Sequence, residues 1–137
     1  MNEAYGKGIS CEGLDAESEA MEIRKSNLIL QARLLADQRD WDGARNRFAE
    51  AAAIERELAD RCRNIGLNEK AFIHHWSAAG CWAQAGNLYD ALRTCDEILE
   101  RSDVPERLRR VEDFAAKYRV ALAQWHESKP SVAVAED

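Results

Sequence analysis

Apolar residues recur at steps of three and four along most of this 137-residue chain, and this helical spacing is the feature that most limits its fold. The longest stripe follows Asp40 and consists of Trp41, Ala44, Phe48, Ala51, Leu58 and Cys62. Residues that favour strands are scarce, because Val, Ile and Thr together number 13 against 23 Ala and 12 Leu. The chain is therefore predicted to be all-helical.

Four breaks divide this pattern into five helices. They fall at Arg39-Asp40, at Gly66, at Gly86-Asn87 and at Ser102-Asp103, where Ser102 or Asp103 is expected to cap the last helix. Loops this short make consecutive helices pack antiparallel, as helical hairpins. One helical domain is predicted at 15–127, between a flexible arm at 1–14 and a disordered tail at 128–137.

Three features of the expected helices bear on packing or function. The first helix carries a second apolar strip, Ile23, Leu30 and Leu34, beside the one predicted to face the core. Glu55 interrupts the stripe of the second helix, and we expect it at the edge of that stripe rather than paired with an Arg. The last helix has the clearest inward stripe, which consists of Leu108, Val111, Ala115, Tyr118, Leu122 and Trp125.

An internal repeat relates the two halves of this pattern. Leu28, Ala32, Leu35, Asp40, Ala44, Phe48 and Ala51 align at a constant offset of 47 positions with His75, Ala79, Trp82, Asn87, Ala91, Cys95 and Ile98. Each unit is one hairpin. Small residues such as Ala79 and Ala91 allow its two helices to approach closely.

This arrangement resembles the tetratricopeptide repeat (TPR) over residues 24 to 125. Ala79-x2-Trp82, Gly86-Asn87 and Ala91-x3-Cys95 match the family's small-then-aromatic pair, turn and small-then-large pair. The period of 47 exceeds the usual 34, and Arg39 replaces the turn glycine. The resemblance implies about two and a half TPR-like repeats in a short right-handed solenoid; a plain five-helix bundle is the alternative.

Cysteine spacing and charge exclude several classes of protein. Cys11, Cys62, Cys81 and Cys95 form no zinc or redox motif, and the last three are expected to be small buried hydrophobes. No apolar run could span a membrane or act as a signal peptide, which favours a cytoplasmic protein. The net charge of −6 offers no general attraction to nucleic acid or to anionic membranes.

Little in the sequence supports catalysis, a cofactor or a metal site. His74 and His75 are adjacent on a helix and point about 100° apart, so they cannot hold one ion from the same face. The acidic groups Glu55-Glu57-Asp60 and Asp96-Glu97-Glu100 are expected to be solvated helix faces. No catalytic or phosphate-binding motif is present, and we expect no enzymatic activity.

Binding to another protein is the favoured function. In TPR proteins the first helix of each hairpin lines a concave groove that accepts a peptide or helix. The resemblance, together with the apolar strip beside it, suggests a partner-binding set of Ile29, Leu30, Arg33, Asp37, Ile73, Trp76, Ser77 and Arg109. Basic residues between Arg101 and Arg119 suit an acidic segment of the partner, although a solvated surface explains them equally well.

Three alternatives remain open at this stage. Trp76 lies one position from the core stripe of its helix, so it is a core residue or a ligand contact. The apolar strip on the first helix could be a homodimer interface. The protein is expected to be an adaptor or accessory subunit, and the alternative is a TPR-type chaperone for a secreted or aggregation-prone client.

Overall fold

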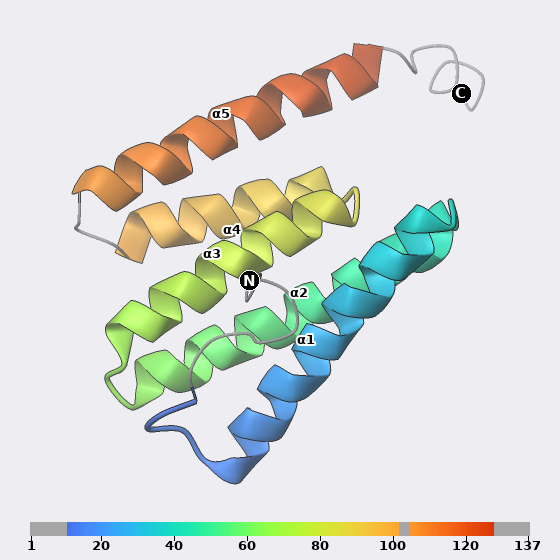
Figure 1. Ribbon diagram of the computed structural model, residues 1–137. Coiled ribbons are helices and arrows are strands. Elements are labelled where there is room, and N and C mark those ends of the chain that lie inside the picture. Colours follow the sequence, from blue (N-terminus) through green and yellow to red (C-terminus); the bar gives the residue numbers. More distant parts are fainter. Residues whose placement is uncertain (1–10, 102–104, 128–137) are drawn as a thin grey trace, which may run out of the picture.

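The computed structural model describes residues 11–101 and 105–127, and in them it contains five helices and no strand (Figure 1). The helices are α1 (Ala16–Asp37), α2 (Trp41–Asn64), α3 (Asn68–Gln84), α4 (Leu88–Arg101) and α5 (Pro105–Glu127). The all-helical prediction is confirmed. The proposed caps Ser102 and Asp103, the tail at 128–137 and most of the N-terminal arm lie outside the described residues.

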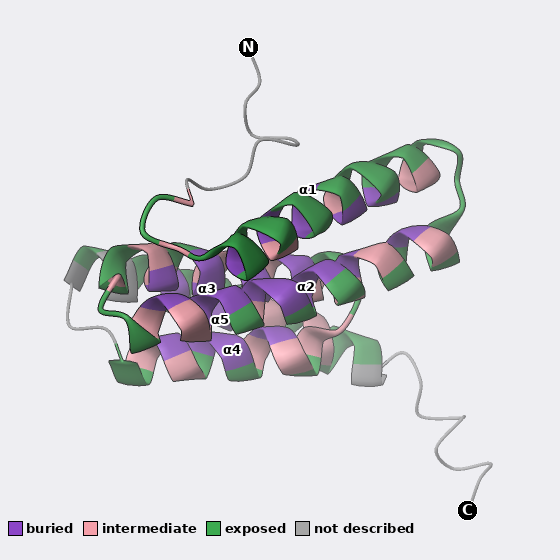
Figure 2. Cartoon of the chain, turned by 90° about the horizontal axis from the view of Figure 1, so that it is seen from below, coloured by how far each residue is buried: buried purple, intermediate pink, exposed green. Residues whose placement is uncertain are grey.

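Each helix packs against the next one in the chain, so the five helices follow one another from α1 at one end to α5 at the other (Figure 1). Figure 2 shows buried residues on the sides where neighbouring helices meet and exposed residues along the outer side of α1. Residues 11–14 lie against the start of α3, where Lys70 donates a hydrogen bond to the carbonyl oxygen of Glu12 at 2.6 Å.

All three described turns between helices use the same hydrogen-bond pattern. After α1 the amide of Asp40 donates to the carbonyl of Leu35, and after α3 the amide of Asn87 donates to Trp82. Both bonds close a Schellman motif, and the two turns are related by the offset of 47 residues. Asp40 and Asn87 then cap the following helices through their side-chain oxygens.

Burial follows the same repeat. Ala32 and Ala79 are buried, as are Ala44 and Ala91, while Leu35 and Trp82 are both half-buried. The core has two clusters. One joins α1, α2 and α3 around Leu28, Ala51, Ala52, Ile54, Leu58 and Cys81, and the other joins α3, α4 and α5 around Ala79, Cys95, Ile98, Val111 and Ala115.

Three predictions about the stripes are wrong. Trp41 and Trp125 are exposed, and each lies near an end of its helix. Glu55 is not at the edge of a stripe: only 1% of it is exposed, since α1 and α3 cover it from two sides. The acidic group that contains Glu55 is therefore not a solvated face throughout.

Candidate functional site

Helix α3 lies between α1 and α5. On one side Cys81 and Trp82 of α3 belong to the first core cluster, which also includes Leu28 and Ile29 of α1. On the other side the ring of Trp76 meets the ring of Phe114 on α5, with centroids 4.8 Å apart in an edge-to-face arrangement. Such an aromatic pair stabilises the contact beyond the area that it buries. The open alternative for Trp76 is thus answered in part: it packs against another helix and remains half-buried.

A strip of α3 between these two contacts faces solvent. Ile73 is 39% exposed, and Ser77 and Gly80, four and seven residues further on, are partly exposed on the same side of the helix. Ile73 is the large apolar side chain of this strip, and Ser77 and Gly80 add little bulk beside it. No atom lies within 4 Å of a Cβ added at Gly80.

The predicted residues of α1 fall in three places. Arg33 follows Ile29 by four residues, so it lies on the side of α1 next to the core cluster that contains Cys81 of α3. Asp37 follows Arg33 by four residues and is exposed on the same side. Ile29 packs against the core cluster, whereas Leu30 is exposed on the side of α1 that faces away from α3.

On α5 the cations next to α3 differ from the predicted one. Arg109 lies two residues before the buried Val111, about 160° around the helix, so it points away from the rest of the fold. Arg110 and Lys117, four residues before and three after Phe114, are exposed on the side that meets α3. The sequence contained this signal, since the helical period relates both residues to Phe114, but it did not show which side of the helix faces α3.

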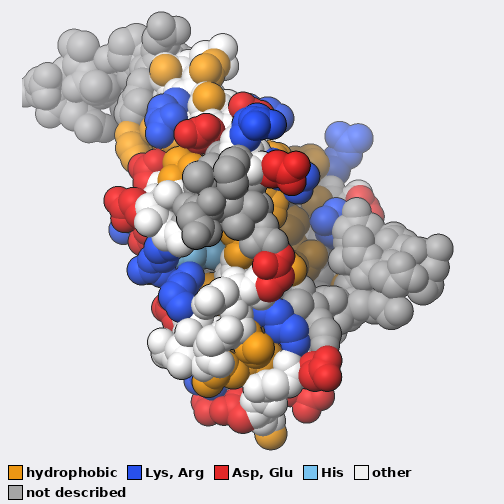
Figure 3. All heavy atoms as spheres, turned by 90° about the vertical axis from the view of Figure 1, so that its left-hand side faces the viewer, with side chains coloured by type: hydrophobic (Ala, Val, Ile, Leu, Met, Phe, Trp, Pro, Cys, Tyr) orange, Lys and Arg blue, Asp and Glu red, His pale blue; other side chains and the backbone are white. Residues whose placement is uncertain are grey.

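We use the name binding face for the surface formed by Arg33 on α1, by Ile73 and Ser77 on α3, and by Phe114, Arg110 and Lys117 on α5. It combines an apolar centre with cations on both outer helices, and the exposed Asp37 lies beside Arg33 on α1. The end of the molecule shown in Figure 3 is different in character, because cationic and anionic side chains are mixed there around a few hydrophobic ones.

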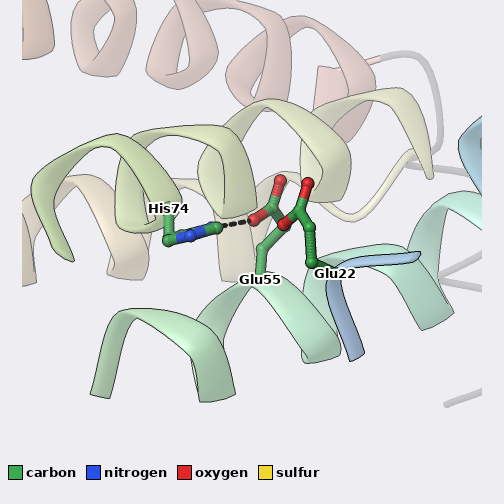
Figure 4. A group of neighbouring side chains, drawn as sticks. All are labelled: Glu22, Glu55 and His74. Carbon is green, nitrogen blue, oxygen red and sulfur yellow. Dashed lines mark hydrogen bonds and ion pairs between the residues drawn. The ribbon is translucent and has the colours of Figure 1, made fainter. Parts of the chain in front are cut away.

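A buried ion cluster lies beneath α3, where three helices meet (Figure 4). Glu22 comes from α1, Glu55 from α2 and His74 from α3, and each is at least 95% buried. His74 donates through Nδ1 to Oε1 of Glu55 at 2.7 Å. Lys25 Nζ lies 2.9 Å from Glu22 Oε2 and 3.3 Å from Glu55 Oε2.

Three ligand atoms of Glu22, Glu55 and His74 lie within 4.8 Å of one another, as a metal site requires. The ammonium group of Lys25, however, already supplies a positive charge to both carboxylates. Burial by itself disfavours the charged form of Lys25, but Glu55 and Glu22 outweigh it, so its pKa is raised. A metal ion would have to displace this ammonium, and we assign the cluster to the packing of α1, α2 and α3.

His75 points about 100° around the helix from His74 and belongs to a second polar group. Arg63 donates to its Nδ1 at 3.2 Å, and its Nε2 donates to Glu97 Oε1, also at 3.2 Å. Arg56 pairs with the same oxygen at 2.9 Å. Burial lowers the pKa of His75, and the nearby Arg63 and Arg56 lower it further, against the opposing effect of Glu97. His75 is therefore neutral in the folded protein near pH 7.

The cysteines behave as the sequence indicates. Cys62, Cys81 and Cys95 are free and buried, and burial raises the pKa of Cys95 to about 11. Thiols with such high pKa values are poor nucleophiles and poor metal ligands at neutral pH.

A small pocket of about 270 Å³ lies at the C-terminal end of α3, where the turn to α4 meets the end of α5. Its lining is mostly apolar and includes Tyr89, Leu122 and Trp125. None of the residues predicted to bind a partner lines it.

Comparison with known proteins adds no identification. No family model matches this sequence, and neither the curated proteins nor the solved structures gave a significant match. Each helix in the described part of the chain is too short or too polar to cross a bilayer.

Proposed function

We propose that this protein is a non-enzymatic adaptor or accessory subunit that binds an acidic peptide or helix of a partner protein on the binding face. The observation that carries the proposal is the position of α3. It lies between α1 and α5 and exposes an apolar strip around Ile73, with Arg33 on one side and Arg110 and Lys117 on the other. Aromatic residues and arginines are the side chains that most often dominate binding energy at protein interfaces.

The finer description of the fold belongs to the same proposal. The two hairpins share the hydrogen-bond pattern of their turns and the burial of their equivalent residues at the offset of 47. This agreement supports a TPR-like arrangement in which α1, α3 and α5 are the first helices of successive hairpins. In such a short solenoid these helices line the concave side.

The arrangement of charges supports an acidic ligand. Arg33 and Arg110 lie on different helices that flank the strip, so a carboxylate-bearing segment laid along α3 would contact cations on both sides. Complementary charge of this kind speeds association and fixes orientation, whereas the apolar strip and the half-buried Trp76 would supply the energy of binding.

The test uses the full-length protein and a displayed library of random peptides. We expect selection to enrich peptides that combine Asp or Glu with an apolar residue. The double substitution Arg33→Glu with Arg110→Glu is expected to weaken binding of an enriched peptide by about a hundredfold, because two attractive contacts become repulsive.

A matched control pairs Arg109→Glu with Arg45→Glu. Both residues are exposed arginines, the first on α5 but turned away from α3 and the second on α2. This control keeps the net charge of the test variant and should bind the peptide as the wild type does. Equal loss in both double variants, or peptides that bind the test variant unchanged, would contradict the proposed face.

The same experiment separates an adaptor from a chaperone. An adaptor is expected to enrich peptides with a common arrangement of charges. A chaperone would enrich apolar peptides with no common arrangement, and their binding would not depend on Arg33 and Arg110.

A further inference from the structure

Helix α1 has an apolar strip on the side opposite its packed side. Ile23, Leu30 and Leu34 are 58%, 38% and 61% exposed, although each is a large aliphatic residue. The packed side of the same helix holds Lys25, Leu28 and Ala32, and α1 stands at the end of the row of helices (Figures 1 and 2). In the described part of the chain nothing packs over this strip.

The strip follows the spacing of a coiled coil. Ala16, Ala20, Ile23, Asn27, Leu30 and Leu34 succeed one another at steps of four, three, four, three and four, which are the a and d positions of successive heptads. All six are exposed. A solvated helix face does not need large aliphatic residues, yet Ile23, Leu30 and Leu34 occupy three of these six positions.

We propose that this strip, the α1 seam, binds the α1 seam of a second copy of the chain in a parallel coiled coil. Asn27 argues for a second copy in this orientation. In a parallel pair the two Asn27 side chains face each other and can hydrogen-bond, which is how a single Asn at an a position sets register. In an antiparallel pair that aligns all six positions, Asn27 would face Ile23 of the other copy and its amide would be buried without a partner.

Charges beside the seam agree with the same alignment. Glu19 precedes the a position of Ala20, and Arg24 follows the d position of Ile23. In a parallel pair the residue before an a position faces the residue five positions later on the partner helix, which brings Glu19 of each copy to Arg24 of the other. The two-fold symmetry forms this opposite-charge contact twice.

The expected dimer is weak and reversible. The seam extends over less than three heptads, and two of its six positions are Ala, so it buries less apolar surface than a long coiled coil does. A dimer of this kind uses a surface separate from Ile73, Phe114 and Arg110, and its existence does not depend on the proposed ligand.

Sedimentation equilibrium of the full chain tests the inference. The wild type should show a monomer–dimer equilibrium, and Leu30→Glu should be monomeric over the same concentration range. Val120→Glu is the matched control, because Val120 is an aliphatic residue of α5 that is 58% exposed and lies outside the seam. It should dimerise as the wild type does, and far-UV circular dichroism should show equal helix content in all three proteins.

Charge exchange tests the orientation. Glu19→Arg should raise the dimer dissociation constant about tenfold, and adding Arg24→Glu in the same chain should restore it, because both cross-helix contacts reform with reversed sign. The inference is overturned if the wild type is monomeric at its highest soluble concentration. It is also overturned if Leu30→Glu still dimerises, or if the double exchange leaves the dimer as weak as Glu19→Arg does.

Arg110→Glu separates this inference from the proposed function. Arg110 lies on α5, outside the seam. The variant should therefore dimerise as the wild type does, while its affinity for the enriched peptide falls.

Discussion

At the scale of single residues, two adjacent histidines have different roles because a helix turns by about 100° per residue. His74 points to Glu55 on α2, and His75 points to Glu97 on α4. The sequence predicts that they cannot hold one ion together. It does not predict that both are buried, since neither the carboxylate partners nor the covering helices can be identified from spacing alone.

His75 should make the stability of the protein depend on pH. Its pKa in the folded protein lies below the ordinary value of 6.5, so the unfolded chain binds more protons between these two values. Its contribution to stability is complete above about pH 6.5 and is lost as the pH falls through the folded pKa.

Urea unfolding at about pH 7.5 and about pH 5.5 measures this contribution, in a range where most carboxylates stay ionised. The free energy of unfolding should fall more in the wild type than in His75→Gln, which keeps a donor and an acceptor but does not titrate. Equal pH dependence in the two proteins would show that His75 is not the responsible group.

At the scale of helices and turns, the repeat is most exact where one helix ends and the next begins. Arg39 and Gly86 occupy the same place in their turns, with φ of 66° and 80°. This left-handed conformation costs a residue with a Cβ about 1–2 kcal/mol, and glycine adopts it freely. In the sequence, Arg39 departs from the TPR pattern, which has glycine at this place. The backbone of its turn nevertheless has the same conformation as the turn at Gly86.

Arg39→Gly should therefore stabilise the protein. The relief of backbone strain exceeds the extra entropy that glycine gives the unfolded chain, so we expect a gain of about 0.5–1 kcal/mol in the free energy of unfolding. Gly86→Ala is the converse variant and should cost about 1 kcal/mol, because a Cβ at this position meets only the Arg45 side chain at 3.4 Å and strain decides the result. Thermal unfolding of both variants checks the pair.

At the scale of the whole molecule, one buried lysine joins three helices. Lys25 on α1 contacts Glu55 on α2, which in turn accepts the hydrogen bond from His74 on α3. Two buried carboxylates without a cation would be strongly unfavourable, so the packing of α1 onto the other helices depends on this ammonium group.

Lys25→Met should destabilise the protein by about 3–5 kcal/mol, because it removes the ammonium group that contacts the buried carboxylates of Glu22 and Glu55. Adding Glu22→Gln should recover part of the loss. Lys117→Met, at an exposed position of α5, is the control and should change the stability by less than about 0.5 kcal/mol. If Lys25→Met and the control had the same urea midpoint, the ammonium group of Lys25 would not be what stabilises the buried carboxylates.

The sequence alone determined the helices and the turns between them, because both depend on contacts within a few residues. Helical spacing placed Ala44, Phe48, Ala51, Leu58 and Cys62 in the core, and turn residues located the breaks. The offset of 47 predicted which positions of the two hairpins are equivalent, and burial confirms that equivalence.

Only the tertiary structure decided which side of each helix meets which neighbour. It buried Glu55 by bringing Lys25 and His74 to it from other helices, and it left Trp41 and Trp125 exposed near the ends of their helices. It also turned Arg110 rather than Arg109 toward α3. These outcomes depend on groups far apart in the chain, and the spacing of residues along one helix contains no information about the groups on another.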